Sequence, residues 1–355
     1  MPLPKGTPIG EYEVVRPIGS GAMGEVYEGV HSVIGKRVAI KVMRAPASEA
    51  VIEAKRLWEE AKVVNAIRHP GIVDIFGANV LPNGRAYLVM ELLEGESLQE
   101  YLRTNLPLAI ADIVWLLQGL LEPLAAAHKA GIIHRDLKPT NVFVSIGPMG
   151  RKVKLLDFGV AHRADRERFT SPEVTVGSLG FMSPDQLGGK VVPQSDVYAV
   201  GCVAWLLLTG KPVFPYGNMG DLALNHMRTV PPSVRTLRAD TPEALARWVA
   251  KLLEKDAAKR PDNAFEALLA LQLAMDDEGI STVVDRGELG DDDDDDEATL
   301  AMPPPSSTRR VVPLFDQDDE GTVAVRPPVS RPPVPEEEED DDDESTVVAP
   351  KDSKR

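Results

Sequence analysis

Four polar side chains that lie close together in the sequence could carry out chemistry on a phosphate group. They belong to the run His134-Arg135-Asp136-Leu137-Lys138-Pro139-Thr140-Asn141 and to Asp157-Phe158-Gly159, which begins sixteen positions after Asn141. Asp136 could take the proton of an attacking hydroxyl group, and Lys138 could neutralise charge on the phosphoryl group in transit. Asn141 and Asp157 could hold magnesium. The spacing therefore predicts a phosphoryl-transfer site.

A glycine-rich segment near the N-terminus could hold the phosphates of a nucleotide. It reads Gly19-Ser20-Gly21-Ala22-Met23-Gly24-Glu25-Val26, and its three glycines let the backbone approach phosphate oxygens without a Cβ atom in the way. The alternative is a dinucleotide-binding turn, which requires a helix directly after the glycines. Because residues 26–30 continue as a strand, the sequence favours the phosphate loop.

Together these motifs resemble those of the protein kinases. Lys138 is typical of kinases that act on serine and threonine, and Ser183-Pro184-Asp185-Gln186 and Ser195-Asp196-Val197-Tyr198 resemble the eukaryotic-like (Hanks-type) serine/threonine kinases of bacteria. The resemblance implies an α+β, two-lobed protein kinase fold, with a small β-rich N-terminal lobe and a larger helical C-terminal lobe. It also implies transfer of the ATP γ-phosphate to Ser/Thr hydroxyls of proteins, including the kinase itself, with Mg²⁺ or Mn²⁺.

The resemblance assigns roles to individual residues. Lys41 is expected to contact the α and β phosphates and to pair with Glu60, while Glu53 on the same helix face is the second choice. Met90 is similar to the gatekeeper at the back of the adenine pocket. The catalytic set is Asp136, Lys138, Lys41 and Glu60, and the metal ligands are Asn141 and Asp157. The expected nucleotide contacts are Ile18, Gly19, Gly21, Gly24, Val26, Ala39, Lys41, Met90, Glu91 and Leu93.

Further expectations concern the segment after Asp157. Arg135 next to Asp136 makes this an RD-type kinase, in which a phosphate on the activation loop could pair with the arginine. The candidate acceptors are Thr170, Ser171 and Thr175.

Three structural contacts are expected in the same region. Ser178 should touch the catalytic Asp and Lys. Asp185, where the family normally has glutamate, should pair with Arg260, and Asp196 should cap the catalytic-loop backbone from a buried helix.

The surrounding elements follow from the hydrophobic pattern. Alternation of apolar and polar residues over 11–42 predicts three antiparallel strands. A helix from about 48 to 68 should end at His69-Pro70-Gly71, and 86–91 should form a further strand. From 97 to about 275 the chain is expected to be mainly helical, with an enlarged hairpin turn at 145–150.

The charge of the chain divides it into two parts. Residues 276–355 hold 26 acidic and 8 basic residues, a net charge of −18, whereas residues 1–275 have a net charge of +2. Such an acidic, proline-rich composition cannot bury enough apolar surface to offset the entropy of ordering. We therefore expect a flexible N-terminus over 1–10, a kinase domain over 11–275 and a disordered tail over 276–355.

The tail repeats one short element. Four threonines each follow acidic residues and precede an apolar one, at Thr282, Thr299, Thr322 and Thr346. These could be phosphorylated by the attached kinase and then dock a phosphothreonine-reading partner such as a forkhead-associated domain. The alternative is that the tail is a solubilising spacer.

The composition of the chain limits the cellular compartment and the binding partners that we expect. The only cysteine, Cys202, lies in a long apolar run and is expected to pack in the core, so no disulfide can form within the chain. No stretch of eighteen or more apolar residues and no signal-peptide core occurs, and no basic block points to nucleic acid. We therefore expect a cytoplasmic protein with no membrane span that acts on protein substrates.

Two other functions compete with protein phosphorylation. A pseudokinase scaffold acting through its tail usually lacks the equivalents of Lys41, Asp136 or Asp157, and all three are present. Phosphorylation of a small molecule is disfavoured by the intact segment from 177 to 185, which docks a peptide in protein kinases.

Overall fold

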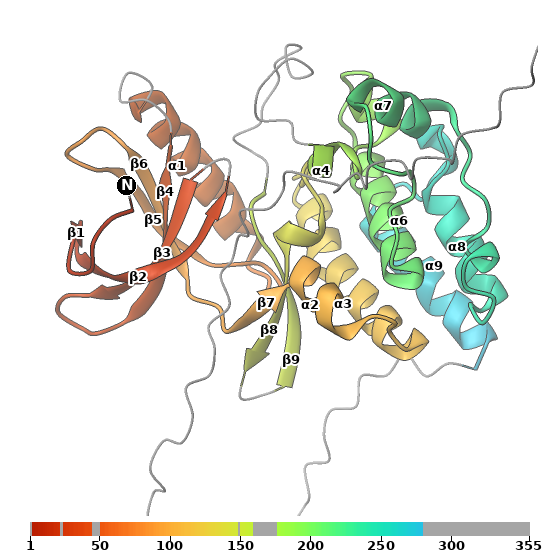
Figure 1. Ribbon diagram of the computed structural model, residues 1–355, viewed down its shortest axis with the longest axis horizontal. Helices are drawn as coiled ribbons and strands as arrows, with labels where there is room; N and C mark the ends of the chain where they lie inside the picture. Colours follow the sequence, from red (N-terminus) through yellow and green to blue (C-terminus); the bar gives the residue numbers. More distant parts are fainter. Residues whose placement is uncertain (1, 22–23, 45–49, 148–149, 159–175, 280–355) are drawn as a thin grey trace, which may run out of the picture. The chain divides into compact units, whose positions relative to one another are not determined.

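The structure is a computed structural model that describes residues 2–21, 24–44, 50–147, 150–158 and 176–279 (Figure 1). The predicted phosphorylation sites in the activation loop (Thr170, Ser171 and Thr175) and in the tail (Thr282, Thr299, Thr322 and Thr346) lie outside these residues.

The N-terminal lobe is a six-stranded antiparallel sheet in the order β1-β2-β3-β4-β6-β5, with helix α1 packed on β5 and β6 (Figure 1). The three strands and the helix predicted over 11–68 are confirmed, as is the strand over 86–91; β1 and β5 were not predicted. The elements are β1 (Pro8–Ile9), β2 (Tyr12–Gly21), β3 (Gly24–His31), β4 (Arg37–Met43), α1 (Ala50–Ile67), β5 (Ile75–Val80) and β6 (Ala86–Glu91).

Strand β4 is buried on both faces, which explains its almost unbroken apolar sequence. Because side chains alternate across a strand, Val38, Ile40 and Val42 pack in a core on the outer side of the sheet. Ala39 and Lys41 then face the opposite side, where Ala39 packs with residues of both lobes. The alternation therefore turns Lys41 toward the C-terminal lobe.

The C-terminal lobe is mainly helical, as expected, and also contains a three-stranded sheet in the order β7-β8-β9. Strands β8 and β9 form the hairpin expected at 145–150. The helices and strands are β7 (Gly95–Ser97), α2 (Leu98–Asn105), α3 (Ile110–Lys129), β8 (Val142–Gly147), β9 (Gly150–Leu155), α4 (Val176–Leu179), α5 (Pro184–Leu187), α6 (Pro193–Thr209), α7 (Met219–Arg228), α8 (Glu243–Leu252) and α9 (Ala264–Asp277). Short 3₁₀ turns are η1 (Pro139–Asn141), η4 (Val234–Thr236) and η5 (Ala257–Lys259).

Helices α3, α6 and α9 form the centre of this lobe. In the described residues, α3 alone is long and apolar enough to cross a membrane, judged by length and composition. Its Ile113, Leu117 and Leu120 are at most 1 % exposed, and a core helix meets the same criteria. Cys202 on α6 is buried as predicted, and burial raises the pKa of its thiol to about 12.

A buried polar cluster joins α6 to α7. The Tyr198 hydroxyl contacts His226 Nδ1 at 3.0 Å and accepts a hydrogen bond from Lys255 Nζ at 3.1 Å. Burial, together with the nearby Lys255 charge, lowers the pKa of His226 to about 4. Burial also lowers the pKa of Lys255 to about 8.

This cluster predicts an acid-sensitive lobe. In the unfolded chain His226 binds a proton near pH 6.5, whereas in the folded chain it does so only near pH 4. The unfolded state therefore binds more protons between these values, and the free energy of unfolding falls as the pH drops through this window, by up to about 3 kcal/mol. His226→Asn keeps an acceptor for Tyr198 but does not titrate. Chemical unfolding from pH 7 to 4 should show a smaller loss for the variant, and parallel curves would contradict the assignment.

Candidate active site

The backbone of the catalytic loop, residues 134–141, is hydrogen-bonded to a buried carboxylate. Asp196 on α6 accepts hydrogen bonds from the backbone N–H groups of His134, at 2.7 Å, and Arg135, at 2.9 Å. His128 Nε2 lies 2.9 Å from the same carboxylate, while its Nδ1 accepts from the backbone N–H of Ala264 at 3.1 Å. Nδ1 is thus the acceptor, so Nε2 carries the proton and donates to Asp196. The expected cap by Asp196 is confirmed.

The polar side chains of the catalytic loop lie around the Asp136 carboxylate. Asn141 Nδ2 donates to the Asp136 backbone oxygen at 2.7 Å and to its Oδ2 at 3.0 Å. Lys138 Nζ lies 3.4 Å from the same Oδ2 and donates to Ser178 Oγ at 2.6 Å. The predicted contact of Ser178 with the catalytic lysine is therefore present. A carboxylate with an amide and an ammonium on one side is oriented to receive a proton from a hydroxyl group.

Lys41 and Asp157 connect the two lobes. Lys41 Nζ and Asp157 Oδ2 form an ion pair at 2.7 Å, although the residues are 116 positions apart. Burial alone would raise the pKa of Asp157, but the charge and hydrogen bond of Lys41 outweigh it, so the pKa lies below its usual value. The carboxylate is thus charged at neutral pH. Glu60 lies on α1, but its side chain is outside the described residues, and its pairing with Lys41 stays a prediction.

One residue of the catalytic loop and one that follows β9 have left-handed backbone angles. Arg135 has φ 70° and Asp157 has φ 46°, a conformation that costs free energy in non-glycine residues and concentrates at functional sites. Phe158 is 1 % exposed, His134 is fully buried, and the centres of their rings lie 4.7 Å apart, so the two side chains pack together. Their packing supports the strained backbone.

An apolar cluster lies beside these polar groups. It combines predicted residues of the N-terminal lobe and the hinge with three that the sequence interpretation missed, Val73, Phe143 and Leu156. Leu156 directly precedes Asp157, and Phe143 is two residues after Asn141, so proximity to the motifs was the available signal for these two. The cluster is formed by Ile18, Val26, Ala39, Val73, Met90, Leu93, Phe143 and Leu156. Apolar and aromatic side chains of this kind are the usual lining of sites for flat ring systems.

The hinge, which connects the two lobes over residues 91–94, is fixed by polar contacts. The backbone N–H of Glu91 donates to the Asp74 carbonyl at 2.9 Å, and the Glu91 carboxylate pairs with Lys154 on β9 at 2.6 Å. Lys154 lies three residues before Asp157. The ion pair therefore ties the hinge to the strand that leads to Asp157, a contact that sequence reasoning did not identify.

The glycine-rich segment forms the turn between β2 and β3, whose tip at 22–23 is outside the described residues. Gly19 and Gly21 are in β2 and Gly24 opens β3. A Cβ atom on Gly24 would lie 2.4 Å from the Val42 carbonyl oxygen. Close packing against β4 therefore requires this glycine, in addition to the phosphate approach that the sequence suggested.

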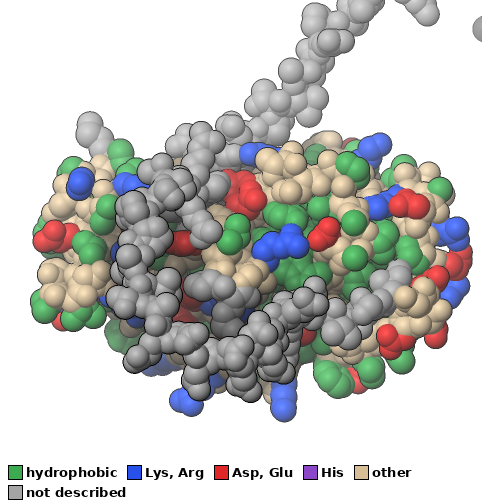
Figure 2. Space-filling model, turned by 90° about the horizontal axis from the view of Figure 1, so that it is seen from below, with side chains coloured by type: hydrophobic (Ala, Val, Ile, Leu, Met, Phe, Trp, Pro, Cys, Tyr) green, Lys and Arg blue, Asp and Glu red, His purple; other side chains and the backbone are tan. Residues whose placement is uncertain are grey.

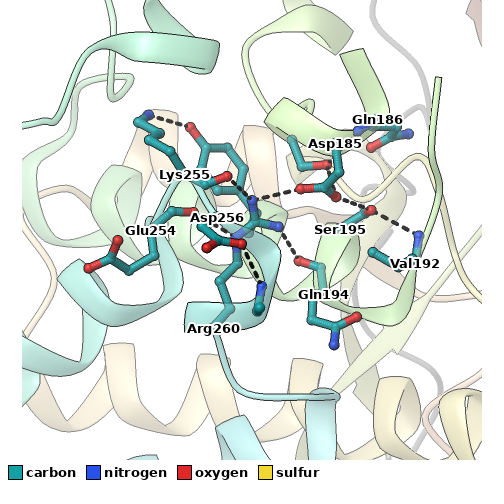
Figure 3. A network of polar contacts seen from close by, with 12 residues as sticks. Asp185, Gln186, Val192, Gln194, Ser195, Glu254, Lys255, Asp256 and Arg260 are labelled. Atoms are coloured by element: carbon teal, nitrogen blue, oxygen red, sulfur yellow. Dashed lines mark hydrogen bonds and ion pairs between the residues drawn. The ribbon is translucent and has the colours of Figure 1, made fainter. Parts of the chain in front are cut away.

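A buried ion pair fixes the segment that follows the activation loop. Arg260 Nη2 donates to Asp185 Oδ1 at 2.7 Å, confirming the predicted pair, and the hydroxyls of Ser183 and Ser195 donate to Oδ2 (Figure 3). The Arg260 side chain is fully buried. Burial would raise the pKa of Asp185, but the hydrogen bonds from Arg260 and Ser195 and the Arg260 charge hold it below its usual value.

Gln186, the next residue, contacts the catalytic loop directly. Its Nε2 donates to the backbone oxygen of Arg135 at 2.5 Å. That carbonyl belongs to the peptide bond that leads into Asp136, so Gln186 fixes the peptide plane immediately before the expected base. The sequence singled out Gln186 only as part of a motif that marks the resemblance.

The site has oxygen ligands suited to the magnesium or manganese ion that the motifs imply. Asn141 uses its amide nitrogen to bond Asp136, so its carbonyl oxygen is the atom that would ligate a cation. Asp157 supplies a charged carboxylate. One carboxylate and one amide, completed by water and substrate phosphates, match the ligands that Mg²⁺ takes in nucleotide sites.

The chain is similar to known proteins both in sequence and in fold. The model of the family described as "Protein kinase domain" matches residues 12–272. The chain is 40 % identical over 277 residues to the serine/threonine-protein kinase pkn2 of Myxococcus xanthus, covering 75 % of this chain and 32 % of that protein. It is 35 % identical over 277 residues to a probable serine/threonine-protein kinase PknB of Lactococcus lactis, covering 78 % of this chain and 42 % of that protein. The chain thus spans about a third to two fifths of these relatives.

Among solved structures, the kinase domain of Mycobacterium tuberculosis PknI has the same fold. The TM-score is 0.62 at 24 % identity, with 78 % of this chain and 100 % of that chain covered. The family match extends over most of the chain, including every predicted active-site residue, and the relatives are bacterial serine/threonine kinases. The chain therefore belongs to the protein kinase domain family.

Proposed function

We propose that this protein is an active serine/threonine protein kinase, which transfers the γ-phosphate of ATP to Ser and Thr hydroxyls of proteins, itself included. The observation that carries the proposal is the position of the Lys41–Asp157 ion pair and of Asp136, Asn141 and Lys138 beside one apolar cluster between the lobes. Adenine bound at this cluster would place the phosphates of ATP toward these charged groups.

Each polar residue then has one task in the transfer. Asp136 accepts or orients the proton of the substrate hydroxyl, and Lys138 neutralises charge on the phosphoryl group. Lys41 holds the α and β phosphates. A Mg²⁺ or Mn²⁺ ion, ligated by Asn141 and Asp157, would neutralise the phosphate oxygens. Glu91 and Leu93 would bond the adenine edge through the backbone.

The direct test uses the full chain, radiolabelled ATP and a generic basic protein. We expect label on serine and threonine after acid hydrolysis of the product, only with Mg²⁺ or Mn²⁺ present. Label on tyrosine alone, or none in the acceptor, would overturn the proposal. The pseudokinase alternative has no support in the relatives or in the residues, since none of its usual losses occurs. We place this activity in the cytoplasm, where ATP is available, as part of signal transduction.

Gln186 predicts a second kinetic result. Gln186→Leu keeps a side chain of similar size but removes the donor to Arg135, so Asp136 should be less well oriented. We expect kcat to fall about tenfold while KM for ATP changes less than about twofold. Gln186→His, which can still donate, should recover part of kcat. Equal losses in kcat for both variants, or a change confined to KM, would contradict a positioning role.

Phosphorylation of the protein by itself gives one further prediction. We expect phosphopeptide mapping of the full chain after incubation with ATP to find phosphate within 165–176 and on the four tail threonines. The phosphate in the loop would pair with Arg135 and order it. Phosphothreonines in the tail would give a forkhead-associated domain a binding site. If mapping finds no phosphate on these threonines, the spacer interpretation of the tail stands.

A further inference from the structure

Helix α9 carries large apolar side chains on two opposite faces, unlike a surface helix with one polar face. The inner face is buried through Ala264, Ala267, Leu271 and Met275. The outer face presents Phe265, Leu269 and Leu273, which are 58 %, 42 % and 58 % exposed. Apolar side chains also reach the surface in green patches bordered by charged groups on the face seen in Figure 2, so exposure alone does not identify a binding site.

The three outer residues form a line. They are spaced four apart, which places them along one side of the helix; we call them the α9 stripe. Asp276, three positions after Leu273, continues the line, and the exposed Asp277 lies next to it. The stripe is therefore an apolar surface with two carboxylates at its C-terminal end. An exposed line of large apolar side chains is a candidate for an interaction site once a matching partner is identified.

One segment of the tail complements the α9 stripe, because it places basic residues first and apolar residues after them. It reads Arg309-Arg310-Val311-Val312-Pro313-Leu314-Phe315, and Phe315 is the only aromatic residue after position 275. We propose that this segment docks on the α9 stripe of its own chain. Leu314 and Phe315 contact the apolar residues, and the two arginines lie beside Asp276 and Asp277.

The dimensions of the two partners agree. From Asp276 to Phe265 the helix rises about 17 Å, and the extended segment from Arg310 to Phe315 spans about 17 Å. The segment would run antiparallel to the helix. The 29 residues from 280 to 308 connect the two, and a flexible linker of that length has an end-to-end distance of about 30 Å, enough to return to the helix. Because the tether keeps the segment close, weak contacts suffice for occupancy.

Limited digestion with trypsin tests the proposal on the full chain. Trypsin cuts after lysine and arginine, but not before proline, so Arg326-Pro327 and Arg331-Pro332 resist cleavage. Cleavage after Arg310 reports on the docked segment, and cleavage after Arg286 serves as a reference within the same tail. The ratio of the two rates is followed by mass spectrometry and requires no kinase activity.

The variants separate docking from other effects. Replacing the three stripe residues by serine should raise the ratio of Arg310 to Arg286 cleavage about tenfold, the change expected when a segment docked about 90 % of the time is released. Phe315→Ser should have the same effect from the other partner, and Asp276→Asn with Asp277→Asn a smaller one. The matched control is serine at Leu224 and Met227 on α7, which are 49 % and 40 % exposed. This control should leave the ratio unchanged.

Three results would overturn the proposal. The first is a wild-type ratio that the stripe variant does not raise. The second is a larger effect of the α7 control than of the stripe variant. The third is protection of Arg310 that increases with protein concentration, which would assign the stripe to the tail of a second copy.

Discussion

Asp157→Asn is expected to lower the rate of phosphoryl transfer at least about a thousandfold, because catalysis of this reaction rests on charge stabilisation and positioning. The change removes the charge that pairs with Lys41 at 2.7 Å and the proposed anionic metal ligand. Lys41→Met and Asp136→Asn should reduce the rate to a similar degree. The measurement is incorporation of labelled γ-phosphate into a generic basic protein with Mg²⁺.

Asp112→Asn serves as the matched control, since it makes the same substitution at a surface carboxylate that contacts Arg151. It should transfer phosphate at the wild-type rate. Circular dichroism should show that all four variants are folded. Wild-type incorporation by a folded Asp157→Asn protein would remove this residue from the mechanism and would favour a different phosphoryl-transfer arrangement.

Arg260→Met should lower the free energy of unfolding by about 3–5 kcal/mol, the cost of leaving one partner of a buried ion pair without the other. The Arg260 guanidinium also donates to the backbone oxygens of Gln194, at 2.8 Å, and Glu254, at 2.7 Å. All of these acceptors lose their partner in the variant. Urea-induced unfolding of the two proteins measures the difference.

The control for this prediction is Arg247→Met on α8. Arg247 is 67 % exposed and pairs with Glu243 at 3.6 Å, and an exposed pair contributes at most about 1 kcal/mol. The double variant Asp185→Leu/Arg260→Met should recover part of the lost stability, because it removes both charges. Equal unfolding midpoints for Arg247→Met and Arg260→Met would refute the importance of the buried pair.

Much of the fold was predictable because local patterns and tertiary contacts agree. The alternation of apolar and polar residues identified β2, β3 and β4 as strands. The proline and glycine after α1 marked the end of that helix. The Asp185–Arg260 and Asp196 contacts were implied by the family resemblance and are present in the structure. The roles of the catalytic residues stay predictions that activity measurements must test, although the structure brings Asp136, Lys138 and Asn141 together.

Other parts of the site could not be predicted, for physical reasons. Phe143 and Leu156 carry no reactive groups, and only the packing of the two lobes brings them into the apolar cluster beside the site. The Gln186 contact depends on a backbone carbonyl, which has no signature in the sequence. The sequence suggested that Gly24 is needed only because it lets phosphate oxygens approach the backbone. Its close contact with Val42 arises from the packing of two strands, which the sequence does not show.

The hydrogen bonds from Ala264 through His128 to Asp196 have a consequence for how the chain is made. The first residue of α9 provides the N–H that sets the His128 tautomer, and His128 in turn donates to the carboxylate that holds the catalytic loop. A ribosome synthesises Ala264 some 130 residues after His134, so a nascent chain that stops earlier lacks this support. Because domains fold as they emerge during synthesis, the loop around Asp136 should reach its final geometry only after α9 has left the exit tunnel.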